Sequence, residues 1–264
     1  MAFADTLARL RHPFRRARLS RGFTARSLSV HPFDTVFGVN TSGMIPASRL
    51  VTGHAHDPHN TAYYAIAPSL FRALCRQWLA GPLPAPPADY TFIDMGAGKG
   101  RAVLMAAEFR FRNVIGVELH RGLARIARRN LRRWRAAGRA LSPARIVCQD
   151  AAEFAFPPGH CLVYAFHPFD ETVFRRLIGR IEEAFAARPG QLDLVYVNAE
   201  YESLLDQHPA FTRLWRQSIP ISPGDADFDR VILSSNDGEQ YGVRGDEICG
   251  AWRWTGIPAA SPGH

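Results

Sequence analysis

The stretch that decides the fold is TFIDMGAGKGR, residues 91–101. An apolar run ends at Asp94, and Gly96, Gly98 and Gly100 follow at alternate positions. Glycine allows positive φ angles and close approach of the backbone to a ligand, and the N-terminus of a helix attracts a carboxylate or a phosphate. The stretch therefore predicts a strand, a ligand-binding turn and a helix in direct succession.

Strands and helices alternate on the C-terminal side of this turn. Apolar runs predict five strands, at 90–95, 113–119, 144–150, 161–167 and 192–198. Helices are expected between them, at 100–109, 122–134 and 170–185. Asp170 is placed as the N-cap of the last helix, and two late strands, 211–220 and 229–236, are expected to form an antiparallel hairpin. This alternation predicts an α/β fold with a doubly wound, mostly parallel sheet.

The N-terminal third does not follow this alternation. Residues 31–60 are rich in Gly, Pro, Ser, Thr and His, which predicts loops and turns. Residues 67–80 have the apolar spacing of a helix, and the proline-rich stretch 81–90 ends it. These shifts divide the chain into a basic N-terminal arm at 1–30, a cap with a lead-in helix at 31–88, the α/β domain at 89–255, and a C-terminal tail at 256–264.

Composition places the chain among globular proteins. Its 264 residues, of which 47% are hydrophobic and 21% charged, suit one large α/β domain with a full core, or at most two small domains. No apolar run approaches the ~20 residues that cross a bilayer, and the N-terminus has no secretory apolar segment. The four cysteines are scattered without a C-x-x-C pair, which favours a reducing compartment over a disulfide framework. We therefore expect a cytoplasmic protein without a membrane partner.

Positive charge is concentrated in two segments of a chain whose net charge is +8. Residues 1–26 contain seven Arg and one acid, and residues 119–149 contain nine Arg and no acid. Such faces suit nucleic acid, phosphate or an acidic partner. Aromatic residues for base stacking are sparse, so a solvated helix face is favoured over a nucleic-acid partner. The first segment also has the composition of an organellar transit peptide.

Three nucleotide-binding motifs compete for the glycine turn. A phosphate-binding P-loop requires G-x-x-x-x-G-K-[ST], but Ile93 stands at its first glycine and Gly100 at its final hydroxyl residue. A dinucleotide fingerprint requires G-x-G-x-x-G, but Arg101 occupies the place of the third glycine. The spacing [DE]-x-G-x-G-x-G is complete from Asp94 to Gly100, and it resembles motif I of class I S-adenosylmethionine-dependent methyltransferases.

Two acids at later strand ends extend the resemblance. Glu118 ends the second strand, where its carboxylate can accept both ribose hydroxyls, and Asp150 ends the third strand and precedes Ala151. The resemblance implies a seven-stranded, Rossmann-like methyltransferase fold that binds S-adenosyl-L-methionine. It implies that the glycine turn approaches the methionine part and that Asp150 or Ala151 contacts the adenine. The expected cofactor-binding residues are Asp94, Gly96, Ala97, Gly98, Lys99, Gly100, Glu118, Asp150 and Ala151.

More narrowly, the chain is similar to a bacterial group of uncharacterised class I methyltransferases, with distant likeness to Dot1-like and archaeal lysine methyltransferases. The similarity spans most of residues 34–200, and it includes FGVNTSGMIP (37–46) and the GxGKGR form of the glycine turn. It implies that Tyr64, Pro68 and Ser69 lie near the cofactor. Thr41 and Ser42 are expected to cover the cofactor or the substrate.

The expected reaction centre is the end of the fourth strand. Many amino-methyltransferases have [DN]-P-P-[YF] there, and this chain has HPFD at 167–170. His167 is predicted to accept a proton or a hydrogen bond from the methyl acceptor, and Phe169 is predicted to pack against it. The histidine puts amide or base N-methylation in doubt and leaves O-methylation open. Asn198 and Glu200, after the fifth strand, are expected to line the same cleft.

Two groups of residues outside these motifs have candidate roles. Lys99 is the only lysine of the chain, and we expect it to contact an acid or the ligand because a cation at a helix N-terminus is otherwise unfavourable. His54, His56 and His59 could ligate a metal with Asp57. Flexible loop histidines are more common, so no metal is predicted.

The predicted function is transfer of a methyl group from S-adenosyl-L-methionine to an N or O nucleophile. Protein, small-molecule and RNA acceptors all remain open. The first alternative is an NAD(P)-linked oxidoreductase, from which the glycine spacing and Asp150 separate a methyltransferase. The second alternative is a catalytically silent cofactor-binding protein that contacts RNA, whose affinity for nucleic acid would fall steeply with salt.

Overall fold

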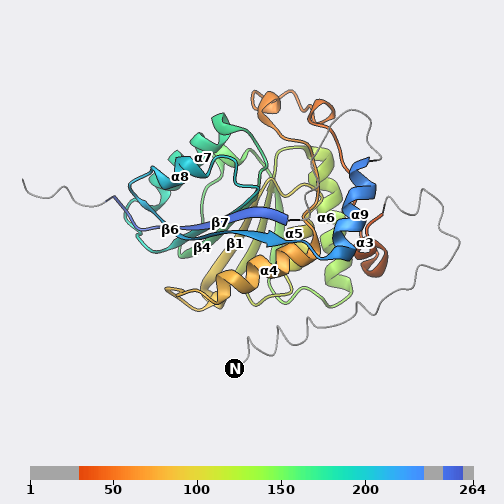
Figure 1. Ribbon diagram of the computed structural model, residues 1–264, viewed down its shortest axis with the longest axis horizontal. Helices are drawn as coiled ribbons and strands as arrows, with labels where there is room; N and C mark the ends of the chain where they lie inside the picture. The colour runs from red at the N-terminus through yellow and green to blue at the C-terminus, as the bar shows by residue number, and fades with distance from the viewer. Residues whose placement is uncertain (1–29, 235–245, 258–264) are drawn as a thin grey trace, which may run out of the picture.

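One mixed sheet runs through the part of the chain that the computed structural model describes, residues 30–234 and 246–257 (Figure 1). Its seven strands are β1 (Tyr90–Met95), β2 (Asn113–Glu118), β3 (Ala144–Cys148), β4 (His160–Phe166), β5 (Leu192–Val197), β6 (Phe211–Pro220) and β7 (Asp246–Trp254). They lie in the order β3-β2-β1-β4-β5-β7-β6. β1 to β5 are parallel, and β7 is antiparallel to β5 and β6. The predicted mostly parallel, seven-stranded α/β sheet is confirmed.

Helices cover both faces of this sheet. They are α3 (Pro32–Phe37), α4 (Pro68–Leu79), α5 (Arg101–Ala106), α6 (Arg121–Ala136), α7 (Glu171–Phe185), α8 (Glu202–Asp206) and α9 (Pro223–Ser234). Asp170 is the N-cap of α7, as predicted, because its carboxylate accepts from the backbone N–H groups of Thr172 and Val173. None of the described helices is long and apolar enough to cross a membrane. The predicted basic arm, residues 1–30, lies almost wholly outside the described residues.

The core lies in two layers, one on each face of the sheet. Every residue of β1 is buried, as expected for a central parallel strand that is covered on both sides. Phe92 belongs to the layer formed with α3, α4, α5 and α6. Its neighbour Ile93 points to the opposite layer, which is formed with α7 and α8. The doubly wound architecture that the sequence predicts is therefore present.

Two predicted elements are wrong. Of the predicted strand 229–236, residues 229–234 continue helix α9, and residues 235–236 lie outside the described residues. The partner of β6 is β7. The buried positions Asp225, Ala226, Asp229 and Ile232 have helical spacing, but two of them are acids, so the apolar pattern hides the helix. The predicted loop 31–60 also contains a helix, α3, which His31 caps by accepting from the N–H of Phe33.

A long segment crosses the carboxyl ends of the parallel strands. This segment, residues 41–66, is called the strap here, and it includes the short helices η1 (Ala47–Arg49) and η2 (Asp57–His59), drawn in orange in Figure 1. Isolated β-bridges join Ile45 to Tyr63 and Asn60 to Phe169. The hydroxyl of Thr61 also donates to the carbonyl of His167 at 2.6 Å. The strap therefore closes the edge of the sheet at which parallel α/β proteins bind their ligands.

Candidate active site

A pocket lies between the carboxyl ends of β1, β2 and β4 and the strap. Its wall includes many of the residues that the sequence predicts for cofactor binding or catalysis: Asp94, Gly96, Ala97, Gly98, Glu118, Asp150, Ala151 and Phe169. Lys99, Gly100 and His167 are adjacent in sequence but do not line this pocket. Pockets of this kind at a strand-order switch point are the usual ligand sites of open α/β sheets.

The glycine turn forms the part of the wall that follows β1. Gly96 and Gly98 have φ angles of 77° and 54°, in the region that glycine adopts most easily. A Cβ atom on Gly96 would lie 2.3 Å from Cβ of Pro168, and one on Gly98 would lie 2.3 Å from Cε2 of Tyr63. The turn therefore packs against both the loop after β4 and the strap, and a side chain at either position would displace a pocket wall.

Two buried carboxylic acids, Asp94 and Glu118, stand side by side in this wall. Asp94 is 3% exposed, and no hydrogen bond between described residues ends on its carboxylate. Burial, and then the charge of Glu118, raise the pKa of Asp94 to about 8. Glu118 accepts from the N–H groups of Gly98 and His120, both at 2.7 Å, but burial still raises its pKa to about 7. Both carboxyls are poised to ionise when a cationic or hydroxyl-bearing ligand arrives.

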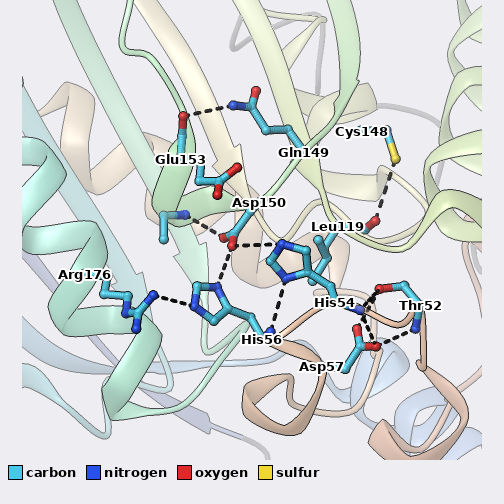
Figure 2. A network of polar contacts seen from close by, with 11 residues as sticks. Thr52, His54, His56, Asp57, Leu119, Cys148, Gln149, Asp150, Glu153 and Arg176 are labelled. Carbon is cyan, nitrogen blue, oxygen red and sulfur yellow. Dashed lines mark hydrogen bonds and ion pairs between the residues drawn. The ribbon is translucent and has the colours of Figure 1, made fainter.

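The third acid, Asp150, is held by the strap (Figure 2). Its carboxylate accepts from Nδ1 of His56 at 2.5 Å and from the N–H of Ala152 at 2.8 Å. Arg176 on α7 donates from Nη1 to Nε2 of His56 at 2.8 Å. Because Nε2 accepts this bond, the proton of neutral His56 resides on Nδ1 and faces Asp150. The strap, the end of β3 and α7 are thereby joined at the edge of the pocket.

The four residues considered as metal ligands do not come together at one point in the structure. His54 and His56 meet Asp150, with potential ligand atoms within 4.8 Å of one another. Asp57 instead accepts from the backbone N–H groups of residues 52–54, and His59 pairs with Asp170 at 2.8 Å. The bond from Arg176 to His56 fixes Nδ1 as a donor, so in this arrangement that nitrogen presents no lone pair to a metal.

His167 lies beside the pocket with both ring nitrogens engaged. Its Nδ1 is 3.2 Å from the hydroxyl of Tyr196, and its Nε2 is 3.4 Å from Oε2 of Glu200. Burial lowers the pKa of His167, although the charge of Glu200 acts against this. Its φ of 36° and the φ of 49° at Asn198 are uncommon for residues other than glycine. His167, Asn198 and Glu200 therefore contact one another, but none of them lines the pocket, whose wall Pro168 and Phe169 form instead.

The only lysine joins the glycine turn to the strap. Nζ of Lys99 donates to the carbonyl of Ser42 at 2.6 Å and lies 5.0 Å from the centre of the Tyr63 ring. Arg101, two residues later, donates to the hydroxyl of Thr41 at 2.8 Å and to the carbonyl of Ile66 at 3.0 Å. Both cations therefore bind neutral oxygens of the strap and its C-terminal end. Ion pairs between described residues include neither of them.

Two residues near the start of α4 that were expected near the cofactor, Tyr64 and Ser69, have different surroundings in the structure. Tyr64 lines the pocket, whereas the backbone N–H of Ser69 donates to Asp225 on α9 at 2.7 Å. Sequence reasoning missed Tyr164, whose side chain points from β4 into the pocket, and Asp34, whose carboxylate accepts from the N–H groups of Thr41 and Ser42. A tyrosine within an apolar strand carries no local signal of this role.

Comparisons with known proteins are confined to distant structural similarity. No protein-family model and no curated protein matches the chain. Similar structures include the 23S rRNA methyltransferase ErmE (15% identity, 72% of this chain and 70% of that chain, TM-score 0.46). A SAM-dependent methyltransferase from Geobacter sulfurreducens, solved with S-adenosyl-L-homocysteine, has 11% identity over 72% of this chain and 92% of that chain (TM-score 0.45). TrmN from Thermus thermophilus has 18% identity over 70% of this chain and 48% of that chain (TM-score 0.46). At these identities and scores the similarity assigns no residue role.

Proposed function

We propose that the chain is a class I S-adenosyl-L-methionine-dependent methyltransferase whose catalytic domain is 89–255. The observation that carries the proposal is the meeting of three acids from successive strand ends, Asp94, Glu118 and Asp150, around one pocket beside a glycine turn. Sequence motifs alone place these acids along the chain. Their convergence in space is a separate observation, and it supports one ligand that extends past all three.

The pocket fits the chemical groups of this cofactor in order. Asp94, whose carboxylate has no hydrogen-bond donor among the described residues, suits the positively charged methionine part. Each oxygen of Glu118 accepts one backbone N–H and retains a lone pair for a ribose hydroxyl. Ala151 and the edge of Asp150 suit the adenine, with His56 holding the carboxylate in place. When bound, the cofactor supplies an electrophilic methyl group.

The residues after β4 are proposed to orient the methyl acceptor. Phe169 is buried and lines the pocket, so its ring can pack against an acceptor that approaches the methyl group in line. His167 is proposed as a positioning residue, because its ring is held by Tyr196 and Glu200 and its carbonyl is bound by the strap. Its role is to fix the backbone that presents Pro168 and Phe169.

The dinucleotide alternative is disfavoured by charge. A pyrophosphate at the glycine turn would lie beside Asp94, a buried carboxyl with no cationic partner among the described ion pairs, whereas Glu118 suits the ribose of either cofactor. A dianion at this place would repel the ionised carboxylate of Asp94 and raise its pKa further. A cofactor with a positively charged sulfonium and ammonium meets the opposite condition.

Calorimetric titration of the full chain with S-adenosyl-L-homocysteine and with NADH tests this proposal. We expect micromolar binding of the sulfur compound and at least a tenfold loss in Asp94→Ala and Glu118→Ala. Glu183→Ala is the matched control, because Glu183 is exposed on α7 and pairs only with Arg180 among described residues. Binding of NADH alone, or equal binding in all variants, would refute the assignment. Transfer of a radiolabelled methyl group then separates an enzyme from a silent binding protein.

A further inference from the structure

The strap brings a histidine to the base end of the proposed cofactor site (Figure 2). His56 lies directly before η2, lines the pocket and is 7% exposed. Its Nδ1 atom is 2.5 Å from Oδ2 of Asp150, which follows β3 and is 5% exposed. Its Nε2 atom is 2.8 Å from Nη1 of Arg176 on α7. Both ring nitrogens of this histidine therefore have a protein partner.

These partners fix the direction of the hydrogen bond between His56 and Asp150. A guanidinium group can only donate, so Nε2 of His56 accepts and the proton of the neutral ring is on Nδ1. Oδ2 of Asp150 consequently accepts from His56, and Oδ1 accepts from the N–H of Ala152 at 2.8 Å. Each oxygen of the ionised carboxylate retains a lone pair. Asp150 therefore presents only hydrogen-bond acceptors to the pocket.

No arginine or lysine pairs with this carboxylate in the part of the chain that the structure describes. Its ion-pair partners there are two histidines, His56 and the partly exposed His54, whose Nε2 atom is 3.8 Å from Oδ2. That distance is too long for a hydrogen bond. A buried carboxylate with open lone pairs favours a ligand that brings an N–H donor, because hydrogen bonds to an ionised acceptor are about twice as strong as neutral ones.

We propose that His56 is a positioning residue that sets the base specificity of the cofactor site, because it presents Asp150 to the exocyclic amino group of adenine. The inference rests on the proposed methyltransferase function, and it adds a residue of the strap to the recognition of the cofactor. A purine with a hydrogen or an oxygen in place of the amino group gives the carboxylate no donor at this position. The site rejects such a base, since its buried acceptor would be left unpaired.

A second histidine of the strap makes a similar contact away from the pocket. His59, in η2, has its Nδ1 atom 2.8 Å from Oδ2 of Asp170. Neither His59 nor Asp170 lines the pocket, whereas His56 and Asp150 both do. The strap is therefore joined to the α/β domain by two histidine–carboxylate contacts, and only one of them faces the proposed base site. The pair separates base recognition from attachment of the strap.

Calorimetry on the full chain with two compounds, S-adenosyl-L-homocysteine and its analogue with purine in place of adenine, tests the inference. Purine lacks only the amino group, so we expect the parent chain to prefer S-adenosyl-L-homocysteine by about tenfold or more. The amide of His56→Gln reaches toward Arg176 and leaves Asp150 without this donor, so the preference should fall to about threefold or less. His56→Asn places an amide N–H close to the position of Nδ1, and its preference should stay within about threefold of the parent value.

His59→Gln is the matched control, because it removes a strap contact of the same chemistry, and it should retain the full preference. A merely structural His56 would lower the affinity for both compounds equally, so a preference that survives in His56→Gln would overturn the inference. Loss of the preference in His56→Asn or in His59→Gln, or equal binding of both compounds by the parent chain, would overturn it too, and the proposed function would stand. If S-adenosyl-L-homocysteine does not bind the parent chain, the proposed function fails, and the inference fails with it.

Discussion

Asp94→Asn should stabilise the unliganded protein while it weakens cofactor binding. Burial, as the main cause, raises the pKa of the Asp94 carboxyl in the folded chain from the ordinary aspartate value of 3.8 to about 8. The folded state therefore holds this proton more tightly than the unfolded state, and stability falls as pH rises from about 3.8 to about 8. At pH 7 the lost stability amounts to up to about 4 kcal/mol. Asparagine cannot ionise, so it removes this loss.

Asp193 on β5 is the matched control, because it is equally buried but fully paired. It is 0% exposed, and it accepts from Nε and Nη2 of Arg253 at 2.7 and 3.0 Å and from the indole N–H of Trp78 at 2.9 Å. Asp193→Asn leaves the guanidinium, itself mostly buried, without its counter-charge. Removal of one partner from a buried pair costs about 3–5 kcal/mol, and the residual exposure of Arg253 places the expected loss near the lower limit.

Urea unfolding followed by tryptophan fluorescence measures both variants. At pH 7.5 we expect Asp94→Asn to be about 2–4 kcal/mol more stable than the parent chain, and Asp193→Asn to be about 3 kcal/mol less stable. At pH 5 the gain for Asp94→Asn should fall by half or more, because the parent carboxyl is protonated in the fold and little ionisation is forgone. A loss of stability in Asp94→Asn at pH 7.5, or a gain that is independent of pH, would refute the reasoning.

Three other predictions concern the turn, the strap and α9. Gly98→Ala places a Cβ atom 2.3 Å from the Tyr63 ring, so we expect calorimetry to show at least a tenfold loss of cofactor affinity. In the control Gly179→Ala on α7, the added Cβ meets no atom within 4 Å, so this variant should gain about 0.5–1 kcal/mol of stability. Lys99→Met removes the tie to the strap, and hydrogen exchange within residues 41–66 should become faster. Burial would raise the pKa of Asp225, but its hydrogen bonds lower it below 3.8. Asp225→Asn should therefore lower the melting temperature at pH 7, by a margin that shrinks below about pH 4.

The central part of the fold could be predicted because its signals are local. Apolar runs, glycines at alternate positions and Asp170 as a helix cap each act within a few residues, and the strands and helices that they predict are present. The prediction of a late strand at 229–236 was wrong because it also relied on local apolar signals. Helix α9 buries Asp225 and Asp229, and a pattern based on apolar residues cannot recognise a helix face that is buried through acids.

The site was predictable only where strand ends determine it. Parallel strands bring Asp94, Glu118 and Asp150 to one edge of the sheet, so their convergence follows from topology. The contacts that the strap makes do not follow from the topology of the sheet. Lys99 binds a carbonyl 57 residues away, and His56 binds Asp150 across 94 residues. Nothing in the local sequence around either residue specifies these partners, since loop closure over such distances is decided by the packing of the whole chain.

The buried cations and acids of this site are not paired with one another, an arrangement that suits ligand binding better than it suits the stability of the unliganded chain. Lys99 and Arg101 are buried and donate to neutral oxygens of the strap, while Asp94 and Glu118 are buried in the pocket wall without an ion-pair partner among the described residues. Exchanging these arrangements, so that cations met acids, would stabilise the unliganded chain. Instead, the cations close the strap and the acids stay available to the pocket. Positively charged ligands should therefore stabilise this protein strongly, because their charge completes pairs that the chain itself leaves open.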